Sequence, residues 1–107
     1  MTNQRYSDSI PSVDVGTTVD SSDLIEFGSF ATGMVYVPAG SSLTTLTWHT
    51  CESKAGTYLA AEDASSAAVT QTVAASQAHP IPAALAGARF LKITGNAAGI
   101  VGVTLKD

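Results

Sequence analysis

Short apolar runs separated by turn residues occupy most of the chain. Within several of these runs apolar and polar residues alternate, and this period of two is typical of a β-strand with one buried face. In the run 43–51, Leu46 and Trp48 share one face, while threonines and His49 share the other. The pattern predicts strands at residues 24–27, 34–37, 43–51, 57–60, 69–73, 89–94 and 100–106, with a further extended segment at 79–82.

Turn chemistry separates the predicted strands. Residues 38–41 (PAGS) end one run, because proline cannot donate to a β-ladder and glycine tolerates the turn. Residues 95–99 (GNAAG) predict a hairpin loop between the last two strands. Seven or eight strands with turn signals about every 8–12 residues are typical of a β-sandwich. We therefore predict an all-β fold, a single antiparallel β-sandwich of jelly-roll or immunoglobulin-like type, with one short helical turn near 82–86.

The N-terminal segment differs from the rest of the chain. Residues 1–22 are dominated by Ser, Thr, Asp and Asn, which predicts an extended N-terminal arm that precedes a sandwich domain at 23–107. Val13 and Val15 alternate with a polar residue, so a short edge strand is an alternative interpretation of this segment. We expect the arm to lie along a partner, and its candidate interface residues are Tyr6, Ile10, Val13 and Val15.

Length, charge and cysteine content narrow the function classes. The 107 residues predict one domain, and the net charge of −4 comes entirely from residues 1–30. Five scattered basic residues do not form the cluster that nucleic-acid binding needs, and no run approaches the roughly 20 apolar residues of a membrane span. With one cysteine and no secretory pattern at the N-terminus, we expect synthesis in a reducing cytoplasm.

Several residues invite a chemical interpretation. His49 and Cys51 lie two positions apart on one strand face, but zinc needs three or four converging ligands, and the other candidates lie on the opposite face or far along the chain. Glu62 and Asp63 are adjacent carboxylates that point apart, which favours a solvated turn over a catalytic pair. No nucleophile elbow is present. We therefore predict no enzymatic activity, no cofactor and no metal site.

The aromatic residues distinguish two kinds of binding surface. Trp48 shares a face with Leu46, which favours the core, whereas Phe90 faces away from Leu91 and Ile93 and is a further candidate interface residue. A carbohydrate-binding module is the alternative. It requires an exposed Trp48, or tyrosines in a row on one face.

Three segments carry a family resemblance. They are LTTLTWHTCESKAGTYLAAED, HPIPAALAGARFLKITGNAAG and the closing VTLKD, and residues 33–42 (GMVYVPAGSS) fit the same pattern. They lie within residues 33–107, about 70% of the chain, and this part of the chain resembles small β-sandwich proteins of tailed bacteriophages and prophages. The motifs consist of packing and turn residues, so the resemblance concerns fold and setting.

The resemblance implies a structural component of a virion. The expected function is a non-enzymatic capsid decoration (cement) protein, or a head-fibre protein, that stabilises the outer surface of a phage head. The expected partners are the major capsid protein or another virion protein, together with further copies of the chain in a homo-oligomer, for which a trimer is one open arrangement. The expected location is the capsid surface, after synthesis in the host cytoplasm. The alternative is a carbohydrate- or receptor-binding module of a tail or fibre.

Overall fold

Nine strands and two 3-10 turns make up the described part of the chain. The computed structural model describes residues 7–28, 32–63, 65–85 and 88–106. In chain order, the elements are β1 (Ser7–Val15), η1 (Val19–Ser21), β2 (Ile25–Glu26), β3 (Thr32–Val37), β4 (Thr45–Cys51), β5 (Leu59–Ala60), β6 (Thr70–Thr72), β7 (Gln77–Pro80), η2 (Ala83–Leu85), β8 (Phe90–Gly95) and β9 (Gly99–Lys106). No helix among the described residues has the length and apolar content to cross a membrane.

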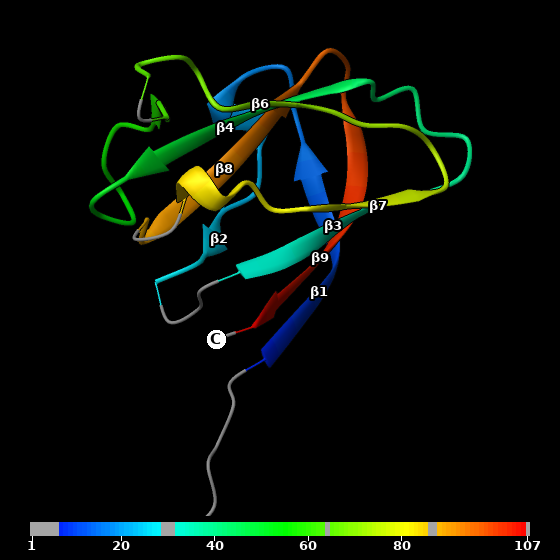
Figure 1. Ribbon diagram of the computed structural model, residues 1–107, viewed down its shortest axis with the longest axis horizontal. Coiled ribbons are helices and arrows are strands. Elements are labelled where there is room, and N and C mark those ends of the chain that lie inside the picture. Colours follow the sequence, from blue (N-terminus) through cyan, green and yellow to red (C-terminus); the bar gives the residue numbers. More distant parts are fainter. Residues whose placement is uncertain (1–6, 29–31, 64, 86–87, 107) are drawn as a thin grey trace, which may run out of the picture.

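The strands form two antiparallel sheets. Sheet A has the order β1-β9-β3-β7, and sheet B has the order β2-β8-β4-β5, with β6 also paired to β4. Figure 1 shows β4 and β8 in one layer and β1, β3 and β9 in the other. The predicted all-β antiparallel fold with sandwich-like packing is confirmed, and the predicted helical turn is the 3-10 turn η2. The described chain has nine strands where seven or eight are predicted. β7 corresponds to the extended segment predicted at 79–82, and β1, which pairs with β9, is the additional strand.

The core lies between the inner faces of the two sheets. Alternate residues of β3, β4, β8 and β9 point into it, as the period-two pattern predicts. Trp48 is fully buried, and its Nε1–H donates to Gln71 Oε1 at 3.2 Å. Gln71 Nε2 in turn donates to the carbonyl of Pro80 at 2.6 Å. Because Trp48 belongs to sheet B and Pro80 to sheet A, the Gln71 amide links the two layers.

The N-terminal segment is part of the sandwich. β1 pairs with β9 along its length, apart from a bulge between Ile10 and Val13, and Val13 and Val15 are only 1% exposed. The predicted arm at 1–22, with the domain beginning at residue 23, is therefore wrong for the described residues from Ser7 onward. Within β1, the polar residues Ser9, Ser12 and Asp14 lie on the solvent face or in the bulge of an edge strand. Tyr6 lies outside the described residues.

The predicted hairpin at 95–99 is also wrong. β8 pairs within sheet B and β9 within sheet A, so this segment crosses between the layers. A Cβ at Gly95 would lie 2.7 Å from a methyl group of Leu43, so the close packing at this position explains why the residue is glycine. Asn96 Oδ1 accepts the backbone N–H groups of Thr44 and Thr45 at 2.8 and 3.1 Å, and its amide group donates to the Ser42 carbonyl. The crossover is therefore fastened to the start of β4.

Candidate functional site

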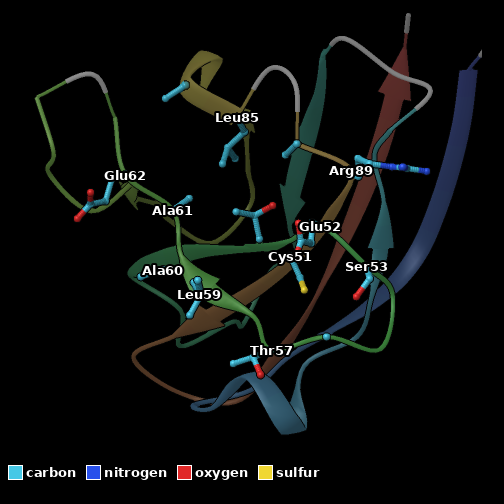
Figure 2. A pocket seen from close by; sticks show the side chains of 14 residues that line it. Cys51, Glu52, Ser53, Thr57, Leu59, Ala60, Ala61, Glu62, Leu85 and Arg89 are labelled. Carbon is cyan, nitrogen blue, oxygen red and sulfur yellow. The ribbon is translucent and has the colours of Figure 1, made fainter.

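An open groove with a volume of about 1190 Å³ lies at one end of sheet B. Its walls are the hairpin that joins β4 to β5 on one side, and η2 with the residues just before β8 on the other (Figure 2). Cys51 and Glu52 lie where β4 ends, and Leu85 extends from η2 toward the same space. The groove therefore combines segments that are distant in sequence.

The turn between β4 and β5 is shaped by Gly56. Its backbone N–H donates to the Ser53 carbonyl at 3.2 Å, and a Cβ at this position would overlap the sulfur of Cys51. Glycine thus allows the turn to fold closely onto the buried Cys51. Further along, Ala61 N–H donates to the Trp48 carbonyl at 2.9 Å, which holds the chain beyond β5 against β4. These contacts fix the wall that carries β5.

Apolar and charged residues both line the groove. Leu59, in β5, is 65% exposed and is the most exposed large hydrophobic residue of the described chain. Alanines from both walls and the buried Leu85 continue this apolar surface. The charged lining residues are Glu52, Glu62 and Arg89. β5 is also the last strand of sheet B in its order, so Leu59 stands on a strand edge. An exposed leucine at a strand edge is a surface suited to an apolar polypeptide segment.

Phe90 lies close to this groove but is partly covered. It is half-buried and points away from the buried Leu91 and Ile93, as the alternation predicts. The guanidinium of Arg89 lies 5.7 Å from the centre of the Phe90 ring. The Arg89 carbonyl accepts the Phe27 N–H at 2.9 Å, which ties this corner to the segment after β2.

The predicted interface residues do not form one surface. Val13 and Val15 are core residues, and Ile10 is partly buried against the core. All three belong to sheet A, whereas Phe90 belongs to sheet B. Sequence reasoning missed Leu59, although two bulky neighbours, Tyr58 and Leu59, precede a run of alanines there and cannot both face inward from a strand.

The residues with metal-binding or catalytic potential have structural partners. His49 Nε2 and Thr94 Oγ1 are 2.9 Å apart, and burial lowers the pKa of His49. Cys51 is buried, and no three His, Cys, Asp or Glu side chains converge on a metal site within the described ranges. Asp63 Oδ1 accepts the N–H groups of Ser65 and Ala67 at 2.8 and 3.1 Å, which is the geometry of a closed turn.

A second cluster of polar side chains surrounds Tyr58. The Lys92 ammonium lies 4.9 Å from the centre of the Tyr58 ring and donates to the Val19 carbonyl at 3.1 Å. The Tyr58 hydroxyl donates to the Lys54 carbonyl, and burial, with smaller contributions from nearby Cys51 and Glu26, raises the Tyr58 pKa. The lysine and tyrosine are therefore held by local contacts.

The aromatic residues in the described part of the chain do not make a stacking platform. Trp48 is fully buried, as its position beside Leu46 predicts. Tyr36 lies on β3 in sheet A, while Tyr58 lies beside sheet B. The row of tyrosines that the carbohydrate-binding alternative requires is therefore not formed by these two residues.

Comparisons with known proteins do not assign a function to this groove. Comparisons of the chain with family models, with curated proteins and with solved structures find no match. The features that bear on function are the groove, the exposed faces of the two sheets and the segments that carry the resemblance.

Proposed function

We propose that the chain is a non-enzymatic structural protein of a virion, a capsid decoration protein that binds the outer surface of a phage head. The resemblance of residues 33–107 to small phage β-sandwich proteins supports the setting. The single structural observation that supports protein binding is the exposed Leu59 on the β5 edge above the groove.

The groove fits an extended segment of the major capsid protein or of another virion protein. β5 is paired to β4 on one side, so its outer edge offers backbone groups to an added strand. Leu59 and Leu85, which both line the groove, would contact apolar side chains of that segment. Glu52 and Glu62, which also line the groove, favour a segment with basic residues beside its apolar ones.

Shell stabilisation follows from binding to the assembled state. Covering an exposed leucine contributes about 1.5–3 kcal/mol, so a single groove contact is modest. A decoration protein that binds the assembled shell, and not the separated subunits, shifts the equilibrium toward assembly at every occupied site. Many weak sites on one lattice therefore stabilise a particle.

The copy number of the chain in purified particles tests this proposal. Quantitative mass spectrometry against the major shell protein should give hundreds of copies per particle. Leu59→Ser should lower the occupancy, because it removes the apolar contact while altering a side chain that is already two-thirds exposed. Thr72→Ala, an exposed change on β6 outside the groove, is the control. A dozen copies or none, or full occupancy by Leu59→Ser, would contradict the proposal.

A further inference from the structure

Gly102 occupies the middle of β9, an inner strand of sheet A, and no contact within the described molecule requires it to be glycine. A Cβ at this position would find its nearest neighbours, the Pro11 carbonyl oxygen and the Tyr36 Cβ, at 3.7 Å, which is ordinary van der Waals contact. By contrast, a Cβ at Gly33 would overlap the Thr104 carbonyl, and one at Gly95 would crowd Leu43. Glycine within a strand weakens the strand and often marks a place where another molecule approaches closely.

The surroundings of Gly102 on the outer face of sheet A are apolar and uncharged. Gly102 of β9 lies opposite Tyr36 of β3, so both residues are on the outer face of sheet A. Tyr36 is 44% exposed, and Ile100, two residues before Gly102 on the same face, is 49% exposed. The next row carries Met34 opposite Thr104. An exposed tyrosine and isoleucine therefore flank a flat position without a side chain.

Charges lie at the two ends of this face and have opposite signs. Asp14 pairs with Ile100 at one end, and Lys106 pairs with Thr32 at the other. Both Asp14 and Lys106 are exposed. The backbone N–H of Asp14 donates to Asp23 Oδ2, which adds a second carboxylate at the acidic end. A second copy turned end over end would place its basic end on this acidic end, and the reverse. The face is thus complementary to itself.

We infer that the outer face of sheet A binds a second copy of this chain, face to face, about a two-fold axis that reverses the strand direction. Sheets packed in this way lie about 10 Å apart with interleaved side chains, and the flat surface at Gly102 receives a side chain from the facing sheet. Tyr36 and Ile100 supply the apolar contact. Asp14 of each copy lies opposite Lys106 of the other copy, and this attraction sets the register. This surface is separate from the groove and does not depend on the proposed function.

The size of the face predicts weak association. Four strands about 4.8 Å apart and seven residues of β9 span roughly 20 by 20 Å, or about 400 Å² on each copy. The total of roughly 800 Å² is below the 1,200 Å² of a standard stable interface. We therefore expect a dissociation constant in the micromolar to millimolar range, measurable by sedimentation of the full chain at concentrations up to about 1 mM.

Gly102→Thr is the central variant. A β-branched residue suits a strand, and its Cβ has room, so we expect an unchanged or higher melting temperature together with a loss of the dimer. Tyr36→Ser should also weaken the dimer by about tenfold or more. It tests the same contact if Gly102→Thr does not fold. Ala68→Thr, which introduces the same residue at an exposed position outside both the groove and sheet A, is the control and should still form dimers.

A charge exchange tests the two-fold register. Lys106→Glu should weaken the dimer by about tenfold, and the double variant Asp14→Lys with Lys106→Glu should restore it, because the opposed ends regain opposite charges. A chain that stays monomeric at about 1 mM would overturn the inference. So would an assembly that Gly102→Thr and Tyr36→Ser leave unchanged, or a double variant that does not recover.

Discussion

Replacing Val13 and Val15 by alanine tests whether β1 belongs to the core of the sandwich. Each side chain is 1% exposed and packs into the common core. A valine-to-alanine change removes two carbon groups worth about 0.8 kcal/mol each, and the cavity left behind adds to this loss. We expect each variant to lose about 2 kcal/mol of unfolding free energy, and the pair about 4 kcal/mol, from a total of roughly 5–15 kcal/mol.

The indole of Trp48 reports this unfolding directly. It is the single tryptophan of the chain and is fully buried, so its fluorescence should change when the core opens in urea. Each single variant should also melt about 10 °C lower than the natural chain. Ser12→Ala, an exposed change in the bulge of the same strand, should stay within about 0.5 kcal/mol. If the double variant unfolds at the same urea concentration as this control, β1 is not part of the core and the arm interpretation returns.

Substitutions at three further positions test the polar contacts. Gln71→Ala should cost about 1–3 kcal/mol in urea unfolding, because it leaves the Trp48 indole N–H and the Pro80 carbonyl without their shared partner. Asn96→Ala should cost a similar amount, whereas Asn96→Asp should recover part of it, since it keeps the acceptor for two backbone N–H groups. Burial lowers the pKa of His49, so the folded chain binds its proton at lower pH than the unfolded chain does. Stability should therefore fall as the pH drops through about 6.5, the unfolded pKa, and His49→Gln should flatten this fall in melting temperatures between about pH 7 and 5.

The inner faces of the strands could be predicted because their signal is local. The alternation around Trp48 and around Ile93 identifies the buried side without any knowledge of the partner strand. Turn residues mark strand ends for the same reason, and the 3-10 turn η2 follows from its opening proline.

Strand partners could not be predicted, because they depend on distant residues. The alternation of Val13 and Val15 is visible in the sequence, but the polar bulge interrupts it before Val13, and the partner strand β9 lies about 90 residues later. The segment 95–99 has the composition of a hairpin loop, but a crossover between sheets uses the same small residues when it packs against Leu43. The pair Tyr58 and Leu59 indicates that one of the two side chains faces outward, but the fold decides which one is exposed. The free space around Gly102 has no signal in the sequence.

The groove and the outer face of sheet A belong to different sheets, and this separation predicts how the two proposed contacts act together. A copy held in a lattice by its groove leaves the Gly102 face open, because no residue of that face lines the groove. Neighbouring copies on a shell have an effective concentration in the millimolar range, which is enough to populate a contact too weak to hold free dimers. Occupancy of particles by the natural chain should therefore rise cooperatively with concentration.

Gly102→Thr should bind the same particles without cooperativity and should need a higher concentration for half occupancy, since only the groove contact remains. Leu59→Ser should have the opposite defect, with normal self-association in solution and low occupancy of particles. Titration of purified particles with each variant, measured by co-sedimentation, separates these outcomes. Equal binding curves for the natural chain and Gly102→Thr would mean that copies on the shell do not contact one another through sheet A.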